Sequence, residues 1–221
     1  MQATLFALIA FIASVLFISA VQAQGQKHCL DDEFTTRVAL FDPTKKYDDL
    51  HEVFFSVKNQ AQRVDIHEFH PHLRRTSIYL LHNEGKMYFV DRGESKCESR
   101  PIEGKLEQYC IASNATHVGQ ITFGGSLKTD VWEEETHGNH IRIVLTAHSN
   151  VPVNVFGRGG HHVGTIFEEF FNFKHGVEDP EKTFELPRAC KHADSNAPLS
   201  EEAKVYAKRA ADLLSVFQKH D

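Results

Sequence analysis

After residue 23 the sequence has no apolar run long enough to cross a bilayer, and within its first 23 residues it has no charged side chain. The opening segment is mostly apolar and ends in Val21-Gln22-Ala23, with small residues at the two positions that a signal peptidase reads. A membrane anchor is the alternative, but no basic cluster follows the run. We predict a signal peptide over residues 1–23 and a secreted or lumenal chain, with the lysosomal lumen as one destination.

The short signatures of catalysis and of metal binding are missing too. The sequence contains no Gly-x-Ser-x-Gly, His-Glu-x-x-His or Cys-x-x-Cys element, and no EF-hand spacing. His67, His70 and His72 fall around Pro71, which interrupts a regular strand, so a solvated bend explains them. We expect a protein that is not an enzyme, with a histidine-dependent hydrolase as the minor alternative.

A surplus of positive charge is also absent. The chain has 24 Lys and Arg against 30 Asp and Glu, a formal net charge of −6, and its basic residues are scattered. Binding to nucleic acid depends on a concentrated positive patch, so this charge argues against a nucleic-acid partner. The 15 histidines would shift the charge toward positive below about pH 6.5.

Cysteine is scarce, and the four that occur are Cys29, Cys97, Cys110 and Cys190. An even number in a secreted chain predicts two disulfides, and the sequence alone leaves three pairings open. Asn114-Ala115-Thr116 is the one Asn-x-Ser/Thr sequence with a permitted middle residue. We predict a glycan on Asn114, in an exposed loop or at a strand end.

The pattern from about residue 35 to 175 predicts a mainly β (α+β) domain. Short runs of β-branched and aromatic residues alternate with turn residues such as Asn83-Glu84-Gly85 and Gly124-Gly125. No helical segment separates the runs, which favours antiparallel pairing. The expected strands span residues 53–57, 63–69, 76–82, 86–91, 117–123, 127–135, 140–148, 151–156 and 163–175.

The composition changes after Cys190. Residues 191–198 are polar, and Ser200 followed by two glutamates is typical of a helix start. Apolar side chains then recur at steps of three and four: Ala203, Tyr206, Ala210, Leu213, Leu214 and Phe217. We predict a β domain over residues 24–190 and a linker with an amphipathic helix over 191–221. The helix would cover the sheet, with binding to a membrane or a partner as the alternative.

The segment GRGGHHVGTIFEEFFNFKHGVEDP, residues 157–180, suggests a chemical site at first sight. Adjacent His161 and His162 would point to opposite faces of a strand, so they cannot readily share a metal ion. Gly157–Gly160 matches neither a P-loop nor a dinucleotide fingerprint, because both need a following helix. A hairpin turn at residues 157–160 is the better explanation.

The strand after that turn is rich in phenylalanine. By simple alternation, Phe167, Phe171 and Phe173 share one face, and Ile166 and Phe170 lie on the other. One apolar face builds the core. The second needs cover from a helix, a second subunit or a ligand.

Several motifs occur in a fixed order between residues 59 and 190. They are Asn59-Gln60-Ala61-Gln62-Arg63-Val64 with Glu68, YLLHNEGKMY at 79–88, Lys96-Cys97, the sequon at Asn114, Gly124-Gly125, Trp132, and Gly176-Val177-Glu178-Asp179-Pro180 with Phe184, Pro187 and Cys190. In this order the chain resembles the ependymin and ependymin-related family of secreted glycoproteins, over almost all of its length after residue 23.

The resemblance implies two curved antiparallel sheets around a deep apolar pocket, similar to bacterial lipoprotein carriers. It also implies homodimers, an extracellular or lysosomal location, binding of lipids or other hydrophobic ligands, and association with calcium. By the family pattern Cys97 pairs with Cys190, which leaves Cys29 with Cys110. The chain departs from the pattern at Asn150, where relatives often carry a cysteine, and Cys110 takes that place.

These observations lead to two hypotheses. In the first, the chain is a non-catalytic secreted glycoprotein that binds a hydrophobic ligand in a β-sheet pocket, with calcium as the only cofactor that the resemblance suggests. The pocket candidates are Phe167, Phe171, Phe173, Trp132, Ile143 and Leu145. In the second, it is an extracellular-matrix, cell-adhesion or signalling protein without a ligand cavity.

Overall fold

The computed structural model describes residues 28–43, 47–68, 75–136, 139–159, 164–201 and 203–207. The fold is mainly β, as the sequence predicts. Its strands are β1 (Glu33–Asp42), β2 (Tyr47–Ser56), β3 (Ala61–Glu68), β4 (Arg75–Leu81), β5 (Lys86–Asp91), β6 (Lys96–Pro101), β7 (Thr116–Phe123), β8 (Leu127–Thr136), β9 (Asn139–Thr146), β10 (Pro152–Gly159) and β11 (Gly164–His175). Two short helical elements follow, α2 (Pro180–Thr183) and η1 (Arg188–His192).

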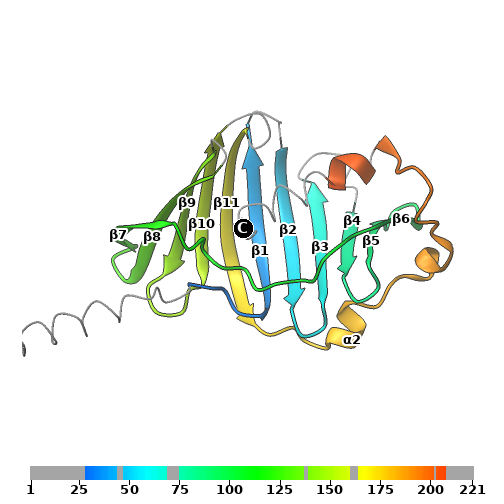
Figure 1. Cartoon of the computed structure of the whole chain (residues 1–221), viewed down its shortest axis with the longest axis horizontal. Coiled ribbons are helices and arrows are strands. Elements are labelled where there is room, and N and C mark those ends of the chain that lie inside the picture. Colours follow the sequence, from blue (N-terminus) through cyan, green and yellow to red (C-terminus); the bar gives the residue numbers. More distant parts are fainter. Residues whose placement is uncertain are drawn as a thin grey trace, which may run out of the picture.

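All eleven strands belong to a single antiparallel sheet, in the order β6-β5-β4-β3-β2-β1-β11-β10-β9-β8-β7 (Figure 1). The expectation of two separate sheets is therefore wrong. The physical reason is β1, which pairs with β2 along one edge and with β11 along the other. Backbone hydrogen bonding through β1 joins the two halves of the chain into one continuous sheet.

The strand predictions missed β1, β6 and the first half of β2. β6 reads KCESRP, a polar sequence without an apolar run, and it is recruited by its pairing with β5. The predicted hairpin turn at residues 157–160 is also wrong, because Gly157, Arg158 and Gly159 continue β10 up to the pair Gly159–Gly164. The residues that connect β10 to β11, with His161 and His162, lie outside the described residues, as do His70 and His72.

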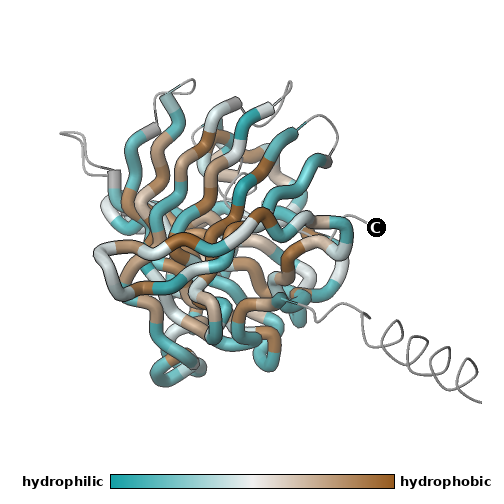
Figure 2. The backbone as a smooth tube through the Cα atoms, turned by 90° about the vertical axis from the view of Figure 1, so that its left-hand side faces the viewer, coloured by the Kyte–Doolittle hydropathy of each residue, from teal (hydrophilic) through white to brown (hydrophobic). Residues whose placement is uncertain are grey.

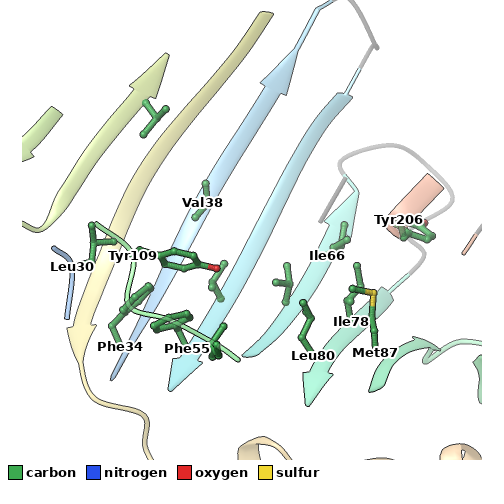
Figure 3. Close-up of a cluster of buried hydrophobic side chains, with 14 of the residues drawn as sticks. Leu30, Phe34, Val38, Phe55, Ile66, Ile78, Leu80, Met87, Tyr109 and Tyr206 are labelled. Atoms are coloured by element: carbon green, nitrogen blue, oxygen red, sulfur yellow. The ribbon is translucent and has the colours of Figure 1, made fainter. Parts of the chain in front are cut away.

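One face of the sheet, here called the inner face, carries the main apolar core. It presents Phe34 and Val38 from β1, Phe55 from β2, Ile66 from β3 and Ile78 from β4, all buried (Figure 3). The burial of β1 alternates strictly, as a strand with one packed face requires. The same core extends to Ile141, Ile143 and Leu145 on β9 and to Val155 on β10.

A long connection between β6 and β7, residues 102–115, crosses the inner face and is called the strap (Figure 1). Its Tyr109 ring stacks on Phe55 with 4.5 Å between centroids, and the Tyr109 hydroxyl donates to Gln62 Oε1 over 2.9 Å. The backbone of Tyr109 and Ile111 pairs with residues 28–30, and the Cys29–Cys110 disulfide joins the two segments. The strap thus fills the centre of the inner face with its own side chains.

The helix predicted after Ser200 is present at residues 201 and 203–207 and is called the C-terminal helix. The Ser200 hydroxyl accepts a hydrogen bond from the Ala203 amide over 3.2 Å, which caps the first turn. Ala203, Tyr206 and Ala207 are buried in the inner core. In Figure 1 this helix lies in front of the sheet, near β3 to β5.

The opposite, outer face is covered only in part. Residues 184–193 pack on a second apolar cluster that contains Tyr79, Tyr88 and Val90. The Cys97–Cys190 disulfide joins this segment to β6. Arg63 reinforces the attachment, since its Nη1 donates to the Thr183 carbonyl over 2.9 Å. Both disulfides therefore tie a covering segment down, the strap inside and residues 184–193 outside.

Candidate ligand-binding face

Three predicted pocket residues lie together on the inner face. Trp132 on β8 is directly paired with Ile143 on β9, and Leu145 follows two residues along on the same side. Ile143 and Leu145 are buried, whereas Trp132 is partly buried and packs against the core. Antiparallel pairing of β8 with β9 and the alternation of side chains bring this group together.

The three phenylalanines do not share a face, so that part of the prediction is wrong. Asn172 adopts a positive φ of 54°, and the register between β1 and β11 shifts at this point. This bulge reverses the alternation, as an extra strand residue does. Phe173 therefore stacks on Phe34 at 5.2 Å on the inner face, while Phe167 and Phe171 are exposed on the outer face.

Trp132 lies between two imidazole rings at the end of the inner face. The ring centroids of His28 and His117 are 4.4 and 4.8 Å from that of Trp132. Asp130 accepts hydrogen bonds from Gln120 and from His117 Nε2, over 2.9 and 3.0 Å. Desolvation alone would raise the pKa of Asp130, but these hydrogen bonds and the nearby imidazoles outweigh it and lower the pKa. The buried Trp132 Nε1 has no hydrogen-bond partner among the described residues.

A small cavity lies where the C-terminal helix meets the sheet. It has a volume of about 70 Å³ and is lined by residues that include Phe89 on β5, Glu98 on β6, and Ala203 and Tyr206 of the helix. This volume holds a few water molecules but not an acyl chain. The inner face is therefore filled mainly by the chain's own strap and helix side chains.

Sequence reasoning missed a buried polar group on the inner face. Asp42, Asp49, His51 and Glu168 are nearly inaccessible to solvent, and Asp49 Oδ2 lies 3.9 Å from His51 Nε2. Neither ring nitrogen of His51 makes a hydrogen bond within the described part of the chain. The sequence signal for this group lies in β2, where Asp49, His51, Val53 and Phe55 are two residues apart and therefore share one face. Two polar side chains thus lie on the same face as two apolar ones.

The described residues offer no metal site. No group of three or more His, Cys, Asp or Glu side chains among them is placed to hold a metal ion. No described helix is both long and apolar enough to cross a bilayer. Asn114 is exposed at the end of the strap, just before β7, so its side chain is accessible for the predicted glycan.

Fold and site together define a mainly β protein whose single sheet is closed on one face by a disulfide-tethered strap and a helix. This chain belongs to the Ependymin family, whose family model matches residues 70–190, more than half of its length. The two disulfides pair as the resemblance implies, Cys97 with Cys190 and Cys29 with Cys110, and no cysteine is free in the described residues. Two disulfides are typical of proteins of the secretory pathway.

Direct comparison with curated protein sequences gave no match. Among solved structures, an uncharacterized conserved protein from Thermus thermophilus has a TM-score of 0.52 at 10% identity, over 72% of this chain and 88% of that one. MucB gives a TM-score of 0.46 at 11% identity, over 73% of this chain and 60% of MucB. The MucA/MucB complex of Pseudomonas aeruginosa gives 0.44 at 12% identity, over 71% and 56%. At 10% identity, the likeness to the Thermus thermophilus protein concerns the fold alone.

Proposed function

We propose that this protein is a secreted, non-catalytic glycoprotein that binds a lipid or another hydrophobic ligand on the inner face, under the C-terminal helix. The observation that supports it most is the cavity beneath that helix, whose lining combines Phe89, Ala203 and Tyr206 of the apolar core with polar side chains such as Asp91, Lys96 and Glu98. Burial stabilises an acyl chain by about 0.8 kcal/mol for each CH₂ group, so affinity needs no directed polar chemistry. The ligand would enlarge this cavity rather than fill a preformed one.

The C-terminal helix is the element that would move. Of its described residues, Ala203, Tyr206 and Ala207 are buried in the core, and the two alanines bury little apolar area. The strap, by contrast, is fixed by the Cys29–Cys110 disulfide, by Tyr109 and by backbone pairing. Lifting the helix would expose Phe89 and Ile78 while the rest of the core stays closed.

Trp132 provides a direct test, because it is the only tryptophan in the chain and packs against the inner core. We expect added cis-parinaric acid to quench Trp132 emission by energy transfer, with saturation at one ligand per chain or a small whole number. Native mass spectrometry of the secreted protein should also show co-purified lipid. A chain that is empty in the spectrometer and leaves Trp132 emission unchanged contradicts the proposal.

A pair of leucine substitutions on the C-terminal helix tests the position of the ligand. Ala203→Leu adds bulk inside the cavity, whereas Val205→Leu adds it on the exposed side of the same helix. We expect Ala203→Leu to weaken uptake of cis-parinaric acid about fivefold or more, and Val205→Leu to leave it unchanged. Equal uptake by both variants, with unchanged melting temperatures, would place the ligand elsewhere.

The second hypothesis, an adhesion, matrix or signalling role, is favoured by a different feature. The outer face carries an aromatic patch, called the outer patch, formed by the exposed Phe41, Phe167 and Phe171 and the half-buried Phe156. We propose that two copies of the chain associate through it, as the family resemblance suggests. An unpartnered aromatic patch on a sheet is typical of an interaction surface.

Calcium association, also implied by the resemblance, does not fit the described residues. Two of the acids on β8 are already paired, Asp130 with His117 and Glu133 with Arg142. No described cluster supplies the six to eight oxygen ligands that calcium takes. The proposal therefore contains no calcium-dependent step.

A further inference from the structure

The cavity beneath the C-terminal helix has a charged wall, which the burial of an apolar tail does not by itself require. Among the residues that line it, Asp91, Glu94 and Glu98 are acidic and Lys96 is basic. Three negative charges against one positive charge leave this wall with a formal charge of −2. The cavity therefore joins an apolar side, formed by Phe89 and the helix, to an electronegative side.

Strand pairing fixes the order of the residues in this wall. Thr76 on β4 is paired with Asp91 on β5, and Asp91 is paired with Lys96 on β6. Two residues before Asp91, Phe89 is paired with Glu98. Directly paired residues of antiparallel strands point to the same face, as do residues two apart on one strand. All five side chains therefore lie on the inner face, with the charged ones beside Phe89 at the end of β5.

Thr76 gives an independent indication that a polar group binds at this wall. Only 4% of Thr76 is exposed, and its Oγ1 makes no hydrogen bond to any residue that the structure describes. A buried hydroxyl without a partner costs free energy, so such a group in a cavity wall points to a bound polar group. A hydroxyl oxygen can accept a hydrogen bond from a ligand.

The acids of the wall are held in place but keep the capacity to accept. Asp91 Oδ1 accepts from the amides of Gly93 and Glu94 over 2.8 and 3.0 Å. Glu98 Oε2 accepts from the Ser200 amide over 2.7 Å, at the start of the C-terminal helix. These bonds use one oxygen of each carboxylate, and a carboxylate accepts through both. Each acid can therefore also accept from a donor on a ligand.

Neighbouring cations do not reverse the excess of acid. Arg100, two residues after Glu98 on β6, has its guanidinium 6.0 Å from the centroid of the Phe89 ring. Lys204 on the C-terminal helix is paired with Glu201 at 2.6 Å, so this pair adds no net charge. With Arg100 included, three acids still face two bases. Coulomb attraction at this wall therefore favours a cation over an anion.

We propose that this cavity selects an amphiphile with a protonated amine head, such as a long-chain alkylamine, over a carboxylic acid of the same length. The inference rests on the proposed function, since the tail would be buried beneath the helix. The ammonium group would donate to Thr76 Oγ1 and to the acids. A cavity of about 70 Å³ admits such a head, because a water molecule of similar size occupies about 30 Å³ in the liquid.

Isothermal titration calorimetry of the full secreted protein with dodecylamine, dodecanol and lauric acid, below their micelle concentrations, tests this preference. We expect dodecylamine to bind at least tenfold more tightly than lauric acid at low salt, with neutral dodecanol between them. The ratio should fall as salt is added. Equal affinities, or tighter binding of lauric acid, overturn the proposal. If Trp132 is quenched by cis-parinaric acid in the same sample, the proposed function survives that result. No binding of any of these compounds contradicts both.

A matched pair of charge variants separates the cavity wall from the net charge of the chain. Glu94 and Glu103 are both exposed acids, but Glu94 lines the cavity and Glu103 lies at the start of the strap. We expect Glu94→Gln to weaken dodecylamine binding threefold or more and Glu103→Gln to leave it unchanged. Lys96→Met should strengthen it. Equal loss in the two glutamine variants, or weaker binding by Lys96→Met, contradicts the proposal.

Thr76→Val tests the hydrogen bond to the head, because it replaces the hydroxyl by a methyl group of similar size. No hydrogen bond within the described chain is lost, so stability in urea should not fall. We expect Thr76→Val to weaken dodecylamine about threefold. Dodecyltrimethylammonium, which carries the charge but has no N–H, should bind both proteins equally. Equal losses for the two compounds, or no loss for either, would exclude Thr76 from the site and overturn the proposal.

Discussion

At the scale of single residues, the most connected polar group is Asp65 on β3. Arg63 donates to both its oxygens over 2.9 and 2.7 Å, Ser77 donates over 2.7 Å, and Arg92 lies at 2.6 Å. Burial alone would raise the pKa of Asp65, but the hydrogen bonds and charge of Arg63, with Ser77 and Arg92, outweigh it and lower the pKa from 3.8. Arg63 also lies 5.2 Å from the ring centroids of Phe54 and Tyr79, so the group anchors the outer face.

We predict that Asp65→Asn destabilises the fold by about 3 kcal/mol at pH 7, because two guanidinium groups lose their buried anion. The pH dependence follows from the lowered pKa. Above about pH 5 both folded and unfolded chains carry the ionised carboxylate and the stabilisation is complete. As the pH falls below that, the unfolded state takes up the proton first and the stabilisation is lost.

Urea denaturation of the wild type and Asp65→Asn between pH 7 and pH 2.5 measures both effects. The difference in unfolding free energy between the two should shrink as the pH falls below about 5. Glu52→Gln is a suitable control, since Glu52 forms a half-exposed pair with Arg37 at 3.5 Å. It should change stability by less than about 1 kcal/mol. A constant difference between the wild type and Asp65→Asn across this range would contradict the assignment.

On the inner face, Tyr109 has the anchoring role that Asp65 has on the outer face. Burial raises the pKa of its phenol far above the ordinary value of 10, although the hydrogen bond to Gln62 acts in the opposite direction. Tyr109→Phe keeps the stacking on Phe55 but removes the hydroxyl that Gln62 Oε1 accepts from. We predict a loss of about 1 to 2 kcal/mol in urea denaturation, with native disulfides intact. An unchanged stability would mean that water replaces the hydroxyl.

At the scale of elements, the strap depends on the Cys29–Cys110 disulfide. The bridge closes a loop with a sequence separation of 81 residues, and loops of this length give roughly 4 kcal/mol of stabilisation in the chain-entropy description. We predict that the Cys29→Ser, Cys110→Ser double variant unfolds at a much lower urea concentration. The amides that join the strap to residues 28–30, those of Ile111 and Leu30, should exchange hydrogen faster than the amides of β1 to β3.

The matched variant removes the other bridge, between Cys97 and Cys190, whose sequence separation is 93. Its global cost should be similar, because the loops are similar in length. Its local effect should differ: residues 184–193 should gain exchange while the strap stays protected. If both variants loosen the same segment, the assignment of one bridge to each covering element is wrong.

The sequence predicted elements well where side chains alone determine them. β9 was expected from the alternation of Ile141, Ile143 and Leu145, and the β4–β5 hairpin from Asn83-Glu84-Gly85. The predictions failed where backbone pairing, and not the pattern of side chains, determines the secondary structure. β6 has almost no apolar signal and is strand because β5 offers a free edge, and the bulge at Asn172 left no trace in the pattern of phenylalanines.

The same limit applies to the candidate site. Trp132, Ile143 and Leu145 meet on the inner face because regular alternation carries them there. Phe167 and Phe171 follow the regular alternation and share the outer face, whereas the bulge at Asn172 sends Phe173 to the inner face. The strap was invisible in the sequence, because residues 102–115 have no regular pattern and are held by long-range contacts to residues 28–30 and to Phe55.

At the scale of the whole molecule, the two faces of the sheet are closed to different degrees. The strap and the C-terminal helix close the inner face, whereas residues 184–193 cover the outer face only over β3 to β6. The part over β1, β10 and β11 is left with the outer patch. Figure 2 shows brown, apolar stretches along several strands with teal residues between them, as expected when apolar side chains alternate with polar ones.

The outer patch leads to the last prediction. Phe167 is paired with Phe41 on β1 and with Phe156 on β10, at ring distances of 6.2 and 4.9 Å, and Phe41 and Phe167 are 48 and 40% exposed. If two copies bury these rings, Phe41→Ser with Phe167→Ser should shift the dissociation constant of the dimer at least a hundredfold in sedimentation velocity. The rings are exposed in the single chain, so the variant should keep its thermal stability.

Val205→Ser, an exposed change on the C-terminal helix, is the control and should leave association unchanged. A wild-type chain that stays monomeric when its concentration is raised 100-fold in the same experiment would contradict self-association. The outer patch would then need a different partner.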